Sequence, residues 1–378
     1  MTLLILLLAV TLFLAYANGS NDNFKGVSTL YGSNTLTYGQ ALQLATIGQV
    51  AGSAASVLLA DTLVKAFAGK GLVPAEVSAS SPFLTSVGVG AGATVMLATV
   101  LGFPISTTHA LTGALVGAAF ISNVGSVDPS VLGQSFVMPL LLSPVLAAVT
   151  AMPLYTLAHR FVVANNLTNT SCVCVDPVPA VHASTPAGGA IAMPNVAFAP
   201  AVTVGTIAEC QRAFSYDGRL LGISAQSLVD SLHKLSAFTL CFARGLNDTP
   251  KIFALLFAAS LVRVEISLAL IATAMAAGGW INARKVAEKM SKEITTMNEG
   301  QALVANMVGS FYVIMASKFG LPVSTTHVTV GAITGVGIVN GTARFGVIRN
   351  ILLSWVLTLP IAAMVGATAM YVFRSLGN

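Results

Sequence analysis

Two octapeptides decide the fold of this chain: Gly102-Phe-Pro-Ile-Ser-Thr-Thr-His109 and Gly320-Leu-Pro-Val-Ser-Thr-Thr-His327. Each follows a second repeated motif, which reads Asn-Gly-Ser-Asn-Asp-Asn-Phe-Lys at 18–25 and Arg-Gly-Leu-Asn-Asp-Thr-Pro-Lys at 244–251. The two motifs recur in the same order and at a similar spacing. Because such internal similarity indicates duplicated architecture, the sequence predicts two related halves.

Charged residues are scarce in this chain. Asp, Glu, Lys and Arg make up 8% of the 378 residues, against roughly 25% in an ordinary soluble domain. Hydrophobic residues make up 55%, and the mean hydropathy is +0.83. This composition excludes a soluble enzyme, a nucleic-acid-binding protein and a disordered chain. It predicts an all-α, multi-pass protein of the cell membrane (plasma or inner), embedded in the lipid bilayer with about ten to twelve spans of ~20 residues.

The apolar stretches fall into two blocks that a polar segment separates. We expect a first transmembrane repeat at 1–163, a polar connecting loop at 164–232 and a second transmembrane repeat at 233–378. The apolar start, Leu3–Ala17, ends like a signal-peptidase site. It lacks a basic beginning, however, and runs directly into a motif that recurs later. We therefore expect it to be retained as the first helix.

The Asn-Asp motifs lie within or beside apolar blocks, and a lysine follows each aspartate three positions later. A carboxylate in a membrane segment is expensive, so it usually lines a cavity or binds an ion. Neighbouring glycines and Pro250 predict a broken helix in both copies, which is tolerated only where the backbone lines protein or water. Interfacial Asp–Lys ion pairs are the alternative, and the duplication disfavours it.

The Pro-x-Ser-Thr-Thr-His motifs predict a helix start in each half. Serine and threonine cap free amides of a first turn, and free amides beside hydroxyls form an anion site. Two such termini near the bilayer midplane could surround a tetrahedral oxyanion, whereas ordinary helix capping is the alternative for either copy alone. His109 and His327 could move protons or make structural hydrogen bonds.

The paired motifs, Gly-x-Asn-Asp and Pro-x-Ser-Thr-Thr-His, resemble those of the inorganic phosphate transporter (PiT) family, which includes sodium- or proton-coupled phosphate symporters. The resemblance covers both halves and omits the middle loop. It implies two inverted repeats with broken or re-entrant helices, both termini outside, and a central site. It further implies a secondary transporter, not an enzyme, that moves inorganic phosphate by cation symport with alternating access.

The resemblance also assigns roles to residues of both copies. Hydroxyl, amide and ammonium groups would bind phosphate at Ser106, Thr107, Thr108, Ser324, Thr325, Thr326, Lys25 and Lys251. Four residues would couple ions or shape the site: Asn21, Asp22, Asn247 and Asp248. The two aspartates are the candidate ligands of bound sodium; no other cofactor, no catalytic residue and no nucleic-acid partner is expected. A homo-oligomer is compatible with the sequence.

The chain departs from the usual family pattern at this candidate site. Lys25 and Lys251 stand where a second asparagine is common, Gln49 and Asn306 where glutamates are common, and Arg244 where histidine is common. Every change removes negative charge or adds positive charge. Two hypotheses stay open: the ammonium groups lie near where sister proteins hold sodium, or they point to the headgroups and sodium binds through backbone oxygens.

Three other functions are weighed against phosphate transport. A transporter of another tetrahedral oxyanion, such as sulfate, would use the same hydroxyls and amides, although phosphate can still donate a hydrogen bond to a carboxylate at neutral pH. An intramembrane enzyme is disfavoured because neither a G-x-S-x-G nor an H-E-x-x-H motif occurs. A channel suits the duplicated halves and intramembrane charges less well than a carrier does.

Overall fold

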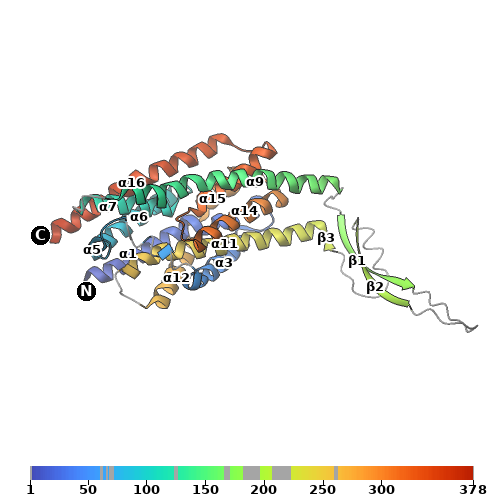
Figure 1. Ribbon diagram of the computed structural model, residues 1–378, viewed down its shortest axis with the longest axis horizontal. Helices are drawn as coiled ribbons and strands as arrows, with labels where there is room; N and C mark the ends of the chain where they lie inside the picture. The colour runs from blue at the N-terminus through green and yellow to red at the C-terminus, as the bar shows by residue number, and fades with distance from the viewer. Residues whose placement is uncertain are drawn as a thin grey trace, which may run out of the picture. The chain divides into compact units, whose positions relative to one another are not determined.

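The computed structural model describes residues 2–59, 63–64, 67, 72–122, 127–165, 171–181, 196–206, 223–258 and 263–377. The chain divides into two compact units: residues 1–156 with 233–378, here called the membrane unit, and residues 157–232, the connecting unit. In the membrane unit the long helices run roughly parallel, and both chain ends lie at the same end (Figure 1).

Helices account for the described elements of the membrane unit. Those of the first half are α1 (Thr2–Asp22), the 3₁₀ turn η1 (Asn23–Val27), α2 (Ser28–Gly32), α3 (Tyr38–Leu59), α5 (Ala75–Ser78), α6 (Ser81–Val100), α7 (Thr107–Ile121), α8 (Pro129–Val131), the π-helical η2 (Leu132–Val137) and α9 (Met138–Ala164). Those of the second half are α11 (Ala225–Ala258), α12 (Val264–Asn282), α13 (Arg284–Lys292), α14 (Glu299–Lys318), α15 (Thr325–Asn340) and α16 (Phe345–Gly377).

Six helical stretches among the described residues are long and apolar enough to cross a membrane. They are Thr2–Gly32, Ser81–Val100, Pro129–Ala164, Val264–Asn282, Glu299–Lys318 and Phe345–Leu376. This is fewer than the predicted ten to twelve spans. One reason is length: α7 and α15 have 15 and 16 residues, about 23 Å, which is less than the ~30 Å hydrocarbon core.

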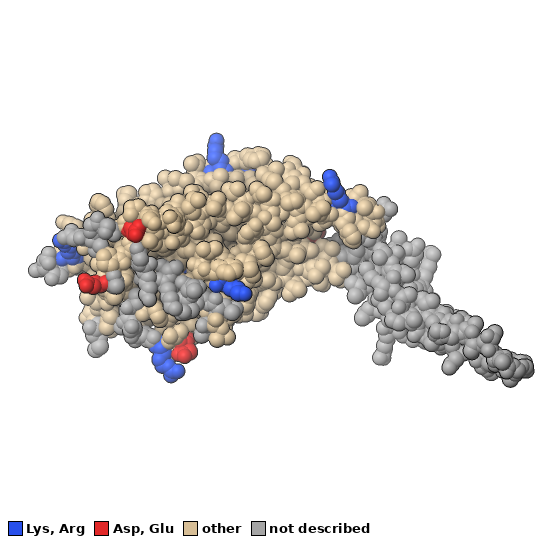
Figure 2. Space-filling view, in the orientation of Figure 1, with Lys and Arg blue, Asp and Glu red and all other residues tan. Residues whose placement is uncertain are grey.

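The outer surface of the membrane unit fits a lipid environment. On the face seen in the space-filling view, the described residues are mostly uncharged, with a few scattered lysine, arginine and acidic residues (Figure 2). Large apolar side chains such as Leu58, Phe120 and Met364 are among the exposed ones. The chain is therefore a multi-pass membrane protein that exposes apolar side chains and buries a set of polar ones.

The local structure at the Asn-Asp motifs differs between the two halves. In the first half, the 3₁₀ turn η1 interrupts the α-helical geometry between α1, which ends at Asp22, and α2, so the predicted break is present only as this turn within the helical stretch Thr2–Gly32. In the second half, α11 continues through Asp248 and Pro250, so the predicted break there is wrong. A proline removes only one amide donor, and neighbouring groups in a membrane protein can satisfy the carbonyl that this frees.

The helix starts at the Ser-Thr-Thr motifs are confirmed. α7 begins at Thr107 and α15 at Thr325, each directly after its serine. The motif prolines, Pro104 and Pro322, lie two residues before the capping serine and outside the first helical turn. Each proline therefore belongs to the non-helical segment that leads into the helix.

The connecting unit contains a three-stranded antiparallel sheet in the order β2-β1-β3. Its strands are β1 (Ser171–Val181), β2 (Val196–Thr206) and β3 (Ile223–Ser224). The sequence predicted a loop for this segment, and residues 166–170, 182–195 and 207–222 of it lie outside the described residues. Valine-rich segments favour strands, which explains why β1 and β2 pair over their full lengths.

Helices of each half pack against helices of the other half through close glycine contacts. Gly19 of α1 packs against the carbonyl of Met275 in α12, and Gly245 of α11 packs against the carbonyl of Gln49 in α3. Gly19 and Gly245 hold the same position of the repeated motif. A Cβ at either position would overlap the facing carbonyl oxygen, so small residues set these helix–helix distances.

The short helices α7 and α15 also pack, through glycines, against long helices of the opposite half. Gly117 of α7 contacts the carbonyl of Ala363 in α16, and Gly335 of α15 contacts that of Ala148 in α9. Each short helix is therefore held by a long helix of the opposite half. The buried starts of α7 and α15 depend on this packing for their positions.

We expect Gly117→Ala to destabilise the membrane unit by about 1–3 kcal/mol, because the added methyl group overlaps the Ala363 carbonyl and forces α7 from α16. The midpoint of thermal unfolding in detergent, followed by size-exclusion chromatography, measures this. Gly39→Ala is the matched control, since a Cβ at Gly39 meets no atom within 4 Å. Equal midpoints for the two variants would show that the contact does not limit stability.

Candidate functional site

The two short helices begin in the same way, with a buried serine cap. Ser106 has an extended backbone, and its hydroxyl accepts a hydrogen bond from the amide of His109 at 3.2 Å. Ser324 accepts from the amide of His327 at 3.2 Å. Helix geometry supplies no partner for the other first-turn amides. Both helix starts therefore direct positive partial charge into the interior of the membrane unit.

The ammonium group of Lys25 lies at the start of α7 and is bound entirely by oxygen. It donates to the side chain of Asn21 at 2.7 Å, to the carbonyl of Ile105 at 2.7 Å and to the hydroxyl of Thr326 at 2.8 Å. It also forms a hydrogen-bonded ion pair with Asp22. Lys25 is 1% exposed, so these four groups replace the water that would otherwise solvate it.

Lys251 makes the matching contacts in the other copy. Its ammonium group donates to the carbonyl of Val323 at 2.8 Å, to the hydroxyl of Thr108 at 2.9 Å and to Asp248 at 3.3 Å. Val323 immediately precedes Ser324, as Ile105 precedes Ser106. Each lysine therefore binds the helix-start loop of its own half and a threonine of the opposite half.

The threonines complete this exchange. Thr326 donates to the carbonyl of Ile105 at 3.0 Å, and Thr108 donates to the carbonyl of Val323 at 3.2 Å. The first threonine of each motif instead contacts its own half: Thr107 donates to Asp22 at 3.0 Å, and Thr325 donates to Asp248 at 3.5 Å. Every threonine hydroxyl of the two motifs thus contacts a group that also contacts a lysine.

Asn21 and Asn247 form hydrogen bonds with the segments that precede α7 and α15, each within its own half. Asn21 donates to Thr99 at 2.9 Å and to the Phe103 carbonyl at 3.0 Å, and it accepts from the Ile105 amide at 3.2 Å. Asn247 donates to the Val323 carbonyl at 3.4 Å and accepts from Ser317 at 3.2 Å. The asparagines therefore position backbone groups rather than extend into open space.

Arg244 breaks the match between the two copies. It occupies the motif position that Asn18 holds in the first half, and its guanidinium forms an ion pair with Asp22 at 3.1 Å. Arg244 is 3% exposed, and its Nη1 has no hydrogen-bond partner among the described residues. Three cations, Lys25, Arg244 and Lys251, then face two carboxylates in one buried cluster. The cluster carries an excess of one positive charge.

The two motif histidines meet beside this cluster. The rings of His109 and His327 are 4.5 Å apart, and His327 Nδ1 lies 3.1 Å from the carbonyl of Leu140. Trp355 stacks on His327 at 3.7 Å and donates to the carbonyl of Pro104 at 3.1 Å. The structural hydrogen bond that the sequence allowed for a histidine is thus present for His327.

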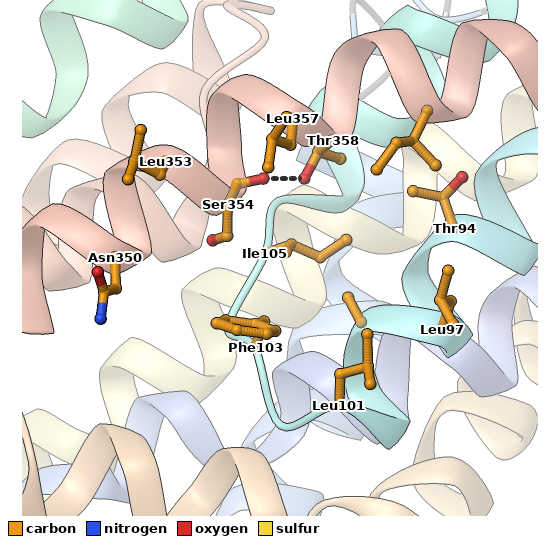
Figure 3. Close-up of a pocket in the computed structure, with 12 residues that line it drawn as sticks. Thr94, Leu97, Leu101, Phe103, Ile105, Asn350, Leu353, Ser354, Leu357 and Thr358 are labelled. Carbon is orange, nitrogen blue, oxygen red and sulfur yellow. Dashed lines mark hydrogen bonds between the residues drawn. The ribbon is translucent and has the colours of Figure 1, made fainter.

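Two apolar pockets lie behind the helix-start loops. One, of about 350 Å³, is lined by residues of α6 and α16 and by Phe103 and Ile105 (Figure 3). A second, of about 410 Å³, is lined by the corresponding residues of α14, with Leu321 and Val323, and by α9. Their walls are almost entirely hydrocarbon, so neither pocket suits an anion.

The structure brings all twelve predicted site residues into one buried cluster. They are Asn21, Asp22, Lys25, Ser106, Thr107, Thr108, Asn247, Asp248, Lys251, Ser324, Thr325 and Thr326. The hypothesis that the lysines point to headgroups is wrong, since both are 1% exposed. The sequence assigned no role to the carbonyls of Ile105 and Val323, because backbone groups carry no residue-specific signal. It also assigned none to Asn18, whose side-chain amide donates to Asp22 and to Thr107 at 2.9 Å.

Comparison with known proteins identifies the family that the repeated motifs resemble. The sequence profile of the phosphate transporter family matches residues 18–366. A putative phosphate permease of Haemophilus influenzae is 27% identical over 97% of this chain and 95% of its own length. The chloroplastic inorganic phosphate transporter 2-1 of Arabidopsis thaliana is 25% identical over 96% of this chain and 71% of its own.

A solved structure shares the fold. "The sodium-dependent phosphate transporter" superimposes with a TM-score of 0.76 at 20% identity and covers 99% of both chains. The matching family is one of transporters, not of enzymes. Because the profile spans nearly the whole sequence, including both copies of both motifs, this chain belongs to the phosphate transporter family.

Proposed function

We propose that this chain is a secondary transporter that moves inorganic phosphate across the membrane by alternating access, together with a cation. The supporting observation is the buried cluster of three cations and two carboxylates between two helix starts. An uncompensated charge is costly inside a protein, and a bound anion would compensate it. Phosphate is the substrate of the matching family.

The groups available to the anion come from both halves. The first-turn amides at Thr107 and Thr325 lie at helix N-termini, which attract oxyanions. The buried Nη1 of Arg244 adds a charged donor without a hydrogen-bond partner among the described residues. Phosphate that still carries a proton could donate it to Asp22 or Asp248, whereas sulfate could not. This supports phosphate over sulfate.

Alternating access is supported by the exchanged contacts. Lys25 binds Thr326 and Lys251 binds Thr108, so a movement of one half against the other would break both contacts together. The binding groups lie where the halves meet, as in transporters built from inverted repeats. We propose that residues 1–163 and 233–378 are two such repeats.

The cation is either sodium or a proton. The structural neighbour is titled sodium-dependent, and at 20% identity it supports the fold rather than the ion. The candidate sodium ligands, Asp22 and Asp248, already bind ammonium groups.

Arg244→Gln should lower the initial rate of labelled phosphate uptake into proteoliposomes about tenfold or more, since a charge-assisted hydrogen bond contributes roughly 1.5–3 kcal/mol. Arg349→Gln, at an exposed position, is the matched control and should transport like the parent chain. Excess sulfate in the same assay should leave uptake unchanged. Strong competition by sulfate would instead assign the site to another oxyanion.

Asp22→Asn and Asp248→Asn should each abolish phosphate uptake, because each leaves a buried lysine without its carboxylate. The two variants are compared with Glu265→Gln, which changes an exposed carboxylate. Size-exclusion profiles in detergent establish that the variants are folded. Normal uptake in a folded variant would remove that aspartate from the site.

Counterflow tests alternating access directly. Proteoliposomes loaded with unlabelled phosphate should transiently accumulate labelled phosphate, because a carrier exchanges one substrate for another at a single alternating site. A channel lets both species equilibrate independently and gives no such overshoot. Absence of the overshoot in liposomes that do admit phosphate would contradict a carrier.

A further inference from the structure

The ammonium group of Lys25 sits in a cage of oxygen atoms. One carboxylate, one amide, one backbone carbonyl and one hydroxyl surround it, from Asp22, Asn21, Ile105 and Thr326. Carboxylate, carbonyl and hydroxyl oxygens are also the ligands that hard metal cations take in proteins. The cage is thus a cation site, and this chain supplies the cation covalently.

Lys251 occupies a second cage that matches the first in three of its four groups and lacks the amide. Asp248 supplies a carboxylate, Val323 a carbonyl and Thr108 a hydroxyl. The two cages use the same positions of the two repeated motifs. Because two lysines at matching positions of the repeat make matching contacts, we take the occupied cage to be a structural feature of this chain.

We propose that Lys25 and Lys251 are the resident cations of these two cages, so that phosphate transport by this chain requires no sodium. The inference rests on the proposed function and deepens it, because it leaves the proton as the coupling cation. It replaces sodium at Asp22 and Asp248 with two tethered ammonium groups.

Charge balance supports the tethered cations. The cluster already holds three positive groups against two carboxylates. Adding sodium beside the lysines would raise the excess positive charge in a buried site, where like charges repel strongly. A tethered ammonium also needs no capture from solution, so it outcompetes a dilute free ion.

Departure of the lysines from their cages is also unfavourable. Both side chains are 1% exposed, and a lysine that left would give up three or four oxygen partners inside the protein. The aromatic face of Phe67 lies 5.7 Å from the Lys251 ammonium group and is a weaker partner than those oxygens. Sodium therefore has no vacated site to enter.

The unmodified protein provides the first test. Initial rates of labelled phosphate uptake into proteoliposomes are compared in sodium chloride and in choline chloride at one pH. We expect rates within about twofold of each other. A tenfold or greater loss in choline would overturn the inference and leave phosphate transport standing. Absence of uptake in both buffers would instead contradict the proposed function.

Equilibrium binding of radioactive sodium to detergent-solubilised protein gives a second readout, which does not depend on transport. The unmodified chain should bind no sodium above background. Lys25→Asn and Lys251→Asn each empty one cage and supply an amide oxygen, so folded variants should gain saturable sodium binding. Lys234→Asn, on the same helix as Lys251 but exposed, should behave like the unmodified chain. Saturable sodium binding by the unmodified chain would overturn the inference.

Discussion

The membrane unit depends on one constraint, the pairing of three buried cations with two buried carboxylates. A charge buried without a partner is costly, so each of these side chains must reach partners during folding. Several of those partners belong to the opposite half: Lys25 reaches Thr326, Lys251 reaches Thr108, and Arg244 reaches Asp22. The polar interior can therefore form only when both halves assemble.

The positions of the short helices α7 and α15 allow these contacts between the two halves to form. α7 and α15 are too short to cross the bilayer core alone, so each places its capped start inside the membrane unit. Glycine contacts with a long helix of the opposite half hold them there, Gly117 on α16 and Gly335 on α9. The side chains of the cluster are themselves almost fully buried, which limits the water that can compete for their hydrogen bonds.

The similar contacts of Lys25 and Lys251, together with the additional positive charge of Arg244, suit a carrier of anions. The two lysines occupy similar oxygen cages, whereas Arg244 has an asparagine at its counterpart position. Among the differences between the two copies, this one creates the positive excess. In the proposed function, the matching contacts would govern how the halves move against each other, and the Nη1 of Arg244, which has no hydrogen-bond partner among the described residues, would favour anion binding.

The sequence by itself determined the membrane class, the duplication and the starts of α7 and α15, and it named the twelve polar residues that lie together in one buried cluster. These follow from hydropathy, repetition and capping, which are local properties. Only the tertiary structure decided that α11 continues through Pro250, that the lysines point inward, and that the carbonyls of Ile105 and Val323 bind them. Those outcomes depend on which distant groups share a buried space, because a buried ammonium takes whatever oxygens the packing of both halves brings within reach.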